Sequence, residues 1–347
     1  MQSPRLHPVS RRGLFWATGV FLVLVTVHTW PLVTDLNGLS RNDNADTMLN
    51  EWAVSWVAHQ LTHNPLRLFD SNIFHPNRYT LAYSEPLIVP GMMGAPLRWL
   101  GASPVLTYNV LLLLGFVLTA LAMYVVMVSW TGDHLAGVLA GALLAFNAHT
   151  IARMPHLQVI HAAAFPLALW TFDRLLIQRR TRDAVWLSLC LLALALTSGH
   201  LVVFAVFALT TALLVRRHEW WGHHGKSFMF RLGGAALVTL PLSIIALWPY
   251  HVLNADDAFR RPLEGIASLS ASPWSYVSTT ARLHYDVWSG YVFRNHSDET
   301  LFSGFVALAL AGAALWWHRP TDAARRRMFI AIGAIGFIMS LGTFTPV

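Results

Sequence analysis

Long apolar stretches recur along almost the whole chain, and they constrain its fold more than any other feature. A helix that crosses a lipid bilayer needs about 20 mostly apolar residues. The ranges that approach this length are 14–33, 105–130, 135–152, 157–177, 184–199, 201–215, 232–250, 301–317 and 328–345. The sequence therefore predicts an all-α, polytopic transmembrane helical bundle of about nine spans, formed by residues 1–347 as one domain. The fifth and sixth ranges are separated only by Ser198-Gly199-His200, which indicates a tight turn.

The composition excludes the other broad classes of protein. Of the 347 residues, 55% are hydrophobic and 12% are charged, whereas a soluble domain carries about 25% charged residues. The single cysteine, Cys190, rules out an intrachain disulfide and a cysteine metal cluster. The net charge of +7 fits basic loops beside a membrane better than a nucleic-acid-binding surface. We therefore expect the lipid bilayer, and no nucleic acid, as a partner.

Basic residues are distributed unevenly between the two sides of the predicted bundle. With the N-terminus inside, the inner segments hold 15 of the 24 Lys and Arg residues, although the outer segments are much longer. Twelve of the 17 acidic residues fall outside. This positive-inside pattern predicts a multi-pass protein of the inner (plasma) membrane with a cytoplasmic N-terminus. The first apolar range follows Arg11-Arg12 as in a signal sequence, but it is long and has no small-x-small cleavage site, so we expect an uncleaved span.

Two predicted outer loops, 34–104 and 251–300, are far longer than simple connectors, which rarely exceed about 15 residues. In the first loop, the apolar residues of 46–61 recur at helical spacing. Residues 86–100 are apolar, but they are too few to span a membrane and are interrupted by proline. We therefore expect two amphipathic helices in this loop, lying on the outer surface of the membrane.

Acidic residues open the first outer loop, directly before its first predicted helix. Asp43 and Asp46 would lie at the boundary between water and lipid, where partial desolvation raises the proton affinity of a carboxylate. Such a group could act as the base that deprotonates an acceptor hydroxyl. The alternative is structural, because Asn44 or Asp46 could simply cap the helix. The spacing alone leaves both interpretations open.

Polar residues also cluster where the third and fourth apolar ranges meet. Arg153, His156 and Gln158 flank Pro155. Arginine could bind a phosphate through its planar guanidinium, and histidine could bind the same group or move a proton. The alternative is a short turn whose polar side chains reach water. In the first loop, Glu85 is a candidate second acid or ligand for a sugar hydroxyl, although a solvated loop residue is the simpler interpretation.

Several motifs of the chain are similar to those of one superfamily. They are Asp46-Thr47-Met48-Leu49-Asn50-Glu51-Trp52, Asn72-Ile73-Phe74-His75-Pro76 and Arg153-Met154-Pro155-His156. Over nearly its whole length the chain resembles the GT-C superfamily of polytopic membrane glycosyltransferases, in particular the bacterial GT-C-like type that depends on polyprenyl-phosphate sugars. The resemblance implies transfer of a sugar from such a lipid-linked donor to an acceptor on the outer face of the membrane.

The resemblance also implies roles for individual residues. In the superfamily an Asp or Glu of the first outer loop activates the acceptor, and Asp46 matches that position, with Asp43 as the second choice. Arg153 and His156 would contact the donor phosphate. The remaining candidate substrate-binding residues are Gln158 and Glu85.

The resemblance constrains the metal requirement and the length of the chain less closely than it constrains the site residues. Some members of the superfamily hold a divalent metal, Mg²⁺ or Mn²⁺, near the donor phosphate. Asp43 and Asp46 are three positions apart and form no Asp-x-Asp pair, so the resemblance leaves the metal open. The chain stops at Val347, at the end of an apolar range, whereas relatives continue with more spans. We therefore expect a C-terminally shortened protein or a fragment.

Two other functions are compatible with the sequence. A lipid or small-solute transporter, or flippase, would carry charged residues within several spans and helices broken at mid-membrane. Here the ionisable residues lie mostly at the ends of the apolar ranges, which favours surface chemistry. An inactive membrane scaffold is the third interpretation, and the sequence does not indicate an oligomeric state.

Overall fold

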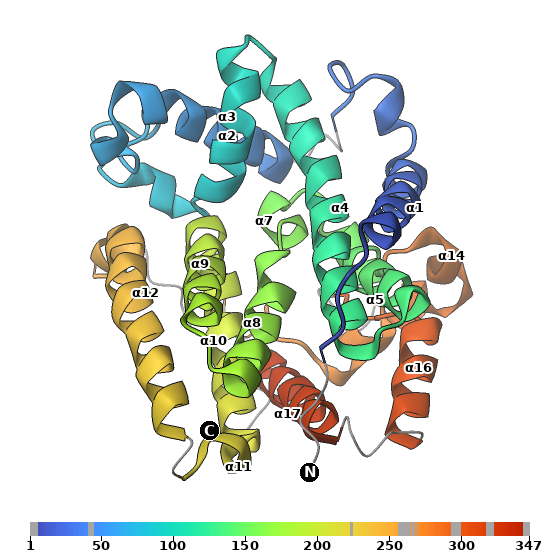
Figure 1. The fold of residues 1–347 in the computed structure, drawn as a ribbon. Helices are drawn as coiled ribbons and strands as arrows, with labels where there is room; N and C mark the ends of the chain where they lie inside the picture. Colours follow the sequence, from blue (N-terminus) through green and yellow to red (C-terminus); the bar gives the residue numbers. More distant parts are fainter. Residues whose placement is uncertain are drawn as a thin grey trace.

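The computed structural model describes residues 6–40, 45–222, 225–255, 265, 267, 269–292, 300–316 and 323–342. Within these residues every regular element is helical and none is a strand, as the apolar ranges predict. Figure 1 shows two levels, because α2 (Ala45–His63) and α3 (Ile88–Trp99) lie across one end of a bundle of longer helices. We call residues 45–100 the α2–α3 layer.

The bundle consists mainly of apolar helices. These are α1 (Arg11–Thr29), α4 (Pro104–Thr131), α5 (His134–Ala145), α6 (Ala148–Ala152), α7 (Leu157–Ile160), α8 (Ala164–Gln178), α9 (Thr181–Thr197), α10 (Gly199–Val215), α12 (Gly225–Asn254), α16 (Phe305–Trp316) and α17 (Ala323–Ser340). The short connecting elements are η1 (Leu32–Thr34), η2 (Pro65–Arg67), η3 (Thr80–Tyr83), α11 (Arg217–Trp220), η5 (Pro273–Val277), α14 (Arg282–His284) and η6 (Tyr285–Ser289). Each of the nine predicted apolar ranges contains one helix or a consecutive pair.

Several of these helices can cross a membrane. Among the described residues, the segments that are long and apolar enough are Arg11–Thr29, Pro104–Thr131, His134–Ala152, Leu157–Gln178 and Gly225–Asn254. α10 and α16 are apolar but shorter. Large hydrophobic side chains such as Phe15 on α1 and Ile245 on α12 are exposed. An apolar surface of this extent suits contact with lipid rather than water. The chain is therefore a helical membrane protein, and the nine-span count stays a prediction.

Glycine allows the first hairpin of the bundle to pack closely. Gly132 follows α4 in the left-handed conformation (φ 73°), which glycine adopts without strain. The side chain of Asp133 then accepts hydrogen bonds from two backbone N–H groups and begins α5. A Cβ atom at Gly141 would lie 2.5 Å from the carbonyl oxygen of Ala120. A larger residue there would push α5 away from α4.

The α2–α3 layer contains helices in the two segments of the first predicted outer loop where the sequence predicts them. Trp52 donates its indole hydrogen to the Asn72 side-chain oxygen (3.0 Å), and Trp56 donates to the Leu68 carbonyl oxygen (2.8 Å). Both indole groups therefore hold the following turn on α2, a contact that the helical spacing of these residues does not predict. The position of the layer on a membrane surface stays a prediction.

The α2–α3 layer and the bundle share one hydrophobic core. Its fully buried members include Phe21 of α1, Val54 of α2, and Leu112 and Phe116 of α4. This shared core fixes α2 relative to α4, and so it determines which polar residues of the bundle lie next to the layer.

Candidate functional site

The turn between α6 and α7 is held in place by α4. After α6 the chain passes through residues 153–156 before α7 begins. Tyr108 of α4 donates its hydroxyl hydrogen to the carbonyl oxygens of Met154 (3.1 Å) and Pro155 (3.3 Å). The Met154 side chain is fully buried. The turn therefore has a defined position on α4, which fixes the backbone positions of Arg153 and His156.

One side chain also joins this turn to α2. The Asn50 amide nitrogen donates to the carbonyl oxygen of Pro155 (3.1 Å) and to that of Asp46 (2.6 Å), one turn earlier on its own helix. Asn50 is buried, so water does not compete for these bonds. Sequence reasoning does not single out Asn50, although its spacing from Asp46 places both residues on one side of a helix.

Asp46, Arg153 and His156 come together through this arrangement. The Asp46 Oδ2 atom lies 3.7 Å from the His156 Nε2 atom, and the two side chains are 47% and 29% exposed. The Asp46 carboxylate also attracts the Arg153 guanidinium. Three of the candidate residues, from segments more than 100 positions apart, thus form one cluster beside the α2–α3 layer.

Burial controls the protonation of the two basic residues in this cluster. Burial lowers the pKa of His156 below its ordinary value; attraction by Asp46 opposes this shift, and repulsion from Arg153 adds to it. Burial also lowers the pKa of Arg153, against the attraction of Asp46. An imidazole with a lowered pKa is mostly neutral at neutral pH, so one of its ring nitrogens donates a hydrogen bond and the other accepts one.

The structure corrects one expectation about the acidic start of the first outer loop. Asp46 lies inside the first turn of α2 rather than before it, so it is not the residue that caps the helix. Its carboxylate is 47% exposed, so about half of the side-chain surface is shielded from water. A carboxylate in the first turn is favoured by the helix dipole. Asp43 and Asn44 lie outside the described residues.

Gln158 lies on α7, immediately after the cluster. Its side-chain oxygen is buried and accepts no hydrogen bond from the part of the chain that the structure describes. An unsatisfied buried acceptor is costly and usually has a partner in the working protein. Gln158 therefore keeps an unused acceptor, and its assignment to substrate binding stays a prediction.

Glu85 has a different environment from the one that the sequence predicts. Its side chain is 12% exposed. It accepts hydrogen bonds from the Ser198 hydroxyl (2.9 Å) and the Gly199 backbone N–H (2.8 Å), and it contacts the His200 ring. Burial alone would raise the pKa of Glu85, but the bonds from His200, Gly199 and Ser198 outweigh it and lower that pKa. The interpretation as a solvated loop residue is therefore wrong.

Glu85 instead joins the α2–α3 layer to the α9–α10 turn. Its carboxylate lies at the first residues of α10, where a negative charge is favoured by the helix dipole. Next to it, the Tyr250 hydroxyl donates to the Ser84 carbonyl oxygen (2.6 Å). The contacts described for Glu85 do not include Asp46, Arg153 or His156, so the structure does not bring it into their cluster.

Inside the bundle, an apolar cavity of about 780 Å³ lies next to α6 and α7, the two helices that flank the turn of residues 153–156. Helices α4, α5, α8, α10 and α17 contribute most of its lining, and Asn147, Thr150 and Val159 contribute from the α6–α7 region. The Asn147 side chain is occupied in capping α6, and the Thr119 hydroxyl donates to the Ile160 carbonyl oxygen (2.7 Å). With these polar groups paired, the cavity suits a hydrocarbon chain.

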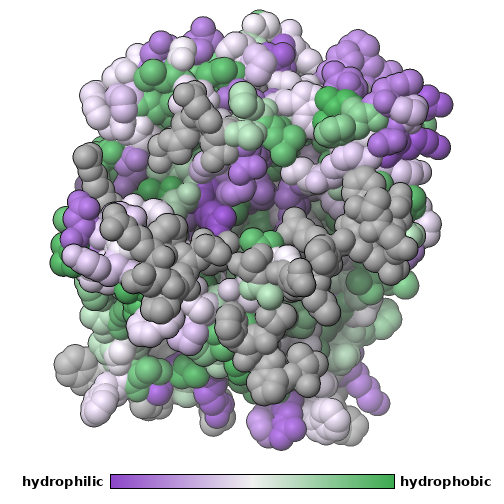
Figure 2. Space-filling view, turned by 180° about the vertical axis from the view of Figure 1, so that it is seen from behind, coloured by the Kyte–Doolittle hydropathy of each residue, from purple (hydrophilic) through white to green (hydrophobic). Residues whose placement is uncertain are grey.

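The distribution of polar surface agrees with this geometry. Figure 2 shows hydrophilic surface at the middle of the rear face, beneath the upper layer, while hydrophobic surface covers much of the flanks below. A ligand with a polar head and an apolar tail matches such a surface better than a uniformly polar or apolar ligand does.

The described residues offer no ready-made metal centre. No group of three or more His, Cys, Asp or Glu side chains is gathered among them in a way that could hold a metal ion. Asp43, which could add a ligand beside Asp46, lies outside the described residues. The expectation of Mg²⁺ or Mn²⁺ therefore stays open.

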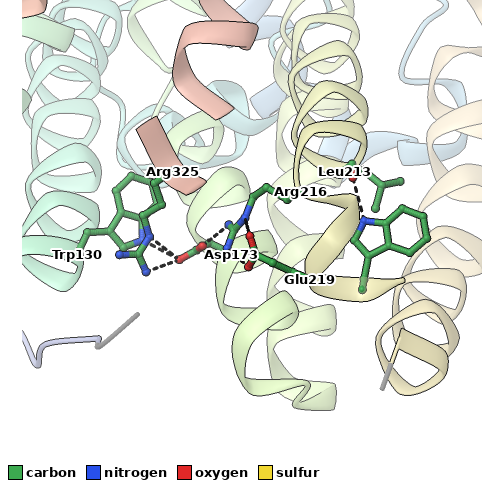
Figure 3. Close-up of polar contacts among 7 residues, drawn as sticks. Trp130, Asp173, Leu213, Arg216, Glu219 and Arg325 are labelled. Carbon is green, nitrogen blue, oxygen red and sulfur yellow. Dashed lines mark hydrogen bonds and ion pairs between the residues drawn. The ribbon is translucent and has the colours of Figure 1, made fainter. Parts of the chain in front are cut away.

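A second polar cluster lies at the opposite end of the bundle (Figure 3). The fully buried Asp173 accepts hydrogen bonds from the Trp130 indole (2.9 Å), from Arg325 Nη2 (2.9 Å) and from Arg216. Glu219 also accepts from Arg216 (2.8 and 2.6 Å). Burial opposes the charge of Arg216, but Glu219 and Asp173 outweigh it and raise the pKa of Arg216. Sequence reasoning misses this cluster; its signal is a single acid inside the fourth apolar range.

Comparison of the chain with protein-family models, with curated proteins and with solved structures finds no match. Fold and site together therefore define a class, a helical membrane protein with a polar cluster at one end of its bundle and an apolar cavity beside it. The resemblance to the GT-C superfamily stays an expectation from motifs, and the function rests on the chemistry of the site.

Proposed function

We propose that the chain is a membrane glycosyltransferase of the GT-C type, which transfers a sugar from a polyprenyl-phosphate donor to an acceptor on the outer face of the inner membrane. The observation that carries this proposal is the 3.7 Å approach of the Asp46 carboxylate to the His156 imidazole, beside Arg153. A base, a neutral imidazole and a guanidinium next to an apolar cavity match the chemistry of a lipid-linked phosphate donor.

Each side chain of the cluster has a separate task. Asp46 accepts the proton of the acceptor hydroxyl while that oxygen attacks the anomeric carbon of the sugar. The bond from this carbon to the phosphate oxygen breaks, and its electron pair leaves with the polyprenyl phosphate. Arg153 binds the phosphate and stabilises the negative charge that develops there. Neutral His156 donates a hydrogen bond to the same phosphate, and Gln158 accepts one from a sugar hydroxyl.

The cavity and the layer complete this assignment. The polyprenyl chain occupies the apolar cavity of about 780 Å³, while its phosphate reaches the α6–α7 turn. With the N-terminus in the cytoplasm, as the charge pattern predicts, and α1 as the first span, the α2–α3 layer would lie on the outer surface of the membrane. Exposed apolar residues of the layer, among them Leu66 and Leu100, support contact with the lipid surface.

The test is transfer by the full-length chain in proteoliposomes that contain a panel of radiolabelled polyprenyl-phosphate sugars. We expect transfer from one donor by the unchanged protein, and its loss in Asp46→Asn with membrane insertion retained. Glu51→Gln is the matched control, because Glu51 lies on the same helix and, among the described hydrogen bonds, its carboxylate accepts only from the Ser40 hydroxyl (3.0 Å). Transfer that persists in Asp46→Asn removes Asp46 from the mechanism.

The buried charges around Asp173 favour one second candidate, a lipid or solute transporter, because ionisable groups within a membrane bundle often mark a transport path. The same proteoliposomes distinguish the two. Movement of a fluorescent polyprenyl-phosphate lipid between leaflets, without sugar transfer, would identify a transporter. An inactive scaffold would show neither transfer nor movement.

A further inference from the structure

A second cavity, of about 480 Å³, follows the hairpin of α8 and α9. Its lining residues are Leu167, Trp170, Thr171, Arg174, Arg182, Asp183, Trp186 and Cys190. They are ordered along the hairpin: the charged residues lie near the turn, the two tryptophans follow, and Leu167 and Cys190 lie deepest in the bundle. At a rise of 1.5 Å per residue, the eight steps from Arg182 to Cys190 cover about 12 Å along α9. The cavity is therefore charged at one end and apolar at the other.

The charged end is firmly held in place. Arg174 donates from Nε to the Asp183 carboxylate (2.8 Å). Its guanidinium also lies over the Trp170 ring, 4.6 Å from the centroid. The Trp170 indole in turn donates to the Ser129 hydroxyl of α4 (2.9 Å). Arg174 consequently points along one wall of the cavity in a fixed orientation, at little further entropic cost on binding.

The charge of this end is positive. Arg174 and Arg182 line the cavity, and Arg182 is exposed. Asp183 is the single acid in the lining, and it is only 1% exposed and already bonded to Arg174. Its second carboxylate oxygen is unpaired but buried, so the amine of a zwitterionic headgroup does not reach it, whereas the exposed Arg182 can bind a phosphate. Charge complementarity thus selects an anion.

An exposed apolar face of α9 adjoins the cavity and shares Trp186 with its lining. Val185, Trp186 and Leu189 are large hydrophobic residues that are exposed there. Tryptophan is typical of the zone where lipid headgroups meet acyl chains, and a basic pocket between helices on the cytoplasmic side suits an anionic headgroup. The basic loops assign the α8–α9 turn to that side.

We infer that the α8–α9 cavity binds one anionic phospholipid of the inner leaflet. The phosphate lies between Arg174 and Arg182, the glycerol backbone lies against Trp186, and an acyl chain follows the groove toward Leu167 and Cys190. This site is separate from the Asp46 cluster, which lies at the other end of the bundle, and it does not depend on the proposed sugar transfer.

Native mass spectrometry of the purified full-length chain tests the inference. The probes are phosphatidylglycerol and phosphatidylcholine with identical acyl chains, titrated separately, and the readout is the fraction of protein that retains one lipid. We expect phosphatidylglycerol to be retained preferentially. Arg182→Gln should weaken its binding about fivefold, as expected for the loss of one basic residue near a headgroup.

Arg180→Gln is the matched control, because Arg180 is exposed on the same turn but does not line the cavity. Trp186→Ala should also weaken binding, whereas Val185→Ala, on the adjacent exposed position outside the lining, should not. Equal losses in Arg182→Gln and Arg180→Gln would overturn the inference, since only the general surface charge would then matter. Equal retention of the two lipids by the unchanged protein would overturn it as well.

Discussion

Asn50 on α2 donates a hydrogen bond to the Pro155 carbonyl oxygen at 3.1 Å, which joins residues 105 positions apart in the chain. The same amide nitrogen donates to the Asp46 carbonyl oxygen. One buried side chain thus sets the separation between Asp46 and the turn that carries Arg153 and His156. In the proposed enzyme Asn50 is a positioning residue, because it acts on the site through these two carbonyl groups.

Replacing Asn50 with alanine removes both hydrogen bonds and loosens the site without removing any reacting group. We expect the kcat of sugar transfer to fall about tenfold or more, because a misplacement of roughly 1 Å is enough for such a loss. The KM for the donor should change little. Gln60→Ala is the matched control. Gln60 lies on the same helix as Asn50, and its side chain donates a similar bond to the Arg67 carbonyl oxygen (3.1 Å). Equal losses in both variants would point to general destabilisation of α2.

The pKa of His156 should respond in opposite directions to its two charged neighbours. Burial holds this pKa below its ordinary value of 6.5, Asp46 raises it and Arg153 lowers it. Asp46→Asn should therefore lower the pKa further, and Arg153→Gln should raise it. The measurement is an NMR titration of ¹³C-labelled histidines in nanodiscs, with His156→Gln to identify the signal. Shifts of the same sign in both variants would contradict the described cluster.

The lowered pKa of His156 also determines whether this residue stabilises or destabilises the protein as the pH falls. The folded pKa is lower than the unfolded one, so the unfolded chain binds more protons below pH 6.5. The contribution of His156 should therefore be constant above pH 6.5 and become destabilising as the pH falls from there toward the folded pKa. Thermal unfolding of His156→Gln should depend less steeply on pH in that window than unfolding of the unchanged protein.

The apolar cavity predicts a contrast between two glycines of α17. A Cβ atom at Gly336 or at Gly333 would meet no atom within 4 Å in the described structure, so both positions tolerate a larger residue. Gly336 lines the cavity, whereas Gly333 does not. Gly336→Leu should raise the KM for a polyprenyl-phosphate donor about tenfold to a hundredfold, because an added side chain of this size displaces roughly 1.5–3 kcal/mol of apolar contact. Gly333→Leu should leave KM unchanged; equal effects would place the lipid chain elsewhere.

The helical class and the positions of the long helices follow from local sequence. In lipid a long apolar stretch must satisfy its own backbone groups, and a helix is the simplest way to do so. Even the tight turn at Ser198 is visible in the sequence, since α9 ends at Thr197 and α10 begins at Gly199. Propensity and hydropathy act over short distances, so they suffice for these features.

Tertiary partners escape this kind of reasoning. Glu85 lies in a polar stretch that suggests solvent, yet its environment is set by the α9–α10 turn, 113 to 115 positions away. In the sequence, Asn50 is only a polar residue of a predicted helix. Its role depends on the packing of the α6–α7 turn against it, which is a tertiary contact. The meeting of Asp46 with Arg153 and His156 was accessible only through the motif resemblance, because no local pattern relates residues so far apart.

Asp173 should be the most sensitive acidic residue for stability. Asp173→Asn leaves Arg325 buried without the carboxylate that neutralises it, while Arg216 keeps only its bonds to Glu219. Breaking a buried ion pair by removing one partner costs about 3–5 kcal/mol. We expect a clear fall in the free energy of unfolding, measured as a lower thermal midpoint in detergent. Asp133→Asn is the control, because this exposed acid caps α5 at the same end of the bundle and asparagine caps a helix about as well as aspartate, so little loss is expected.

The position of Arg325 on α17 gives the Asp173 prediction a second part. Arg325→Met removes one cation but leaves Asp173 paired with Arg216, so its destabilisation should be smaller than that of Asp173→Asn. In the variant that combines Asp173→Asn with Arg325→Met, no Arg325 charge is left to be neutralised. The loss in the free energy of unfolding should therefore be less than the sum of the losses of the two single variants. Additive losses would show that Asp173 and Arg325 do not stabilise each other, and that α17 is held by its apolar contacts alone.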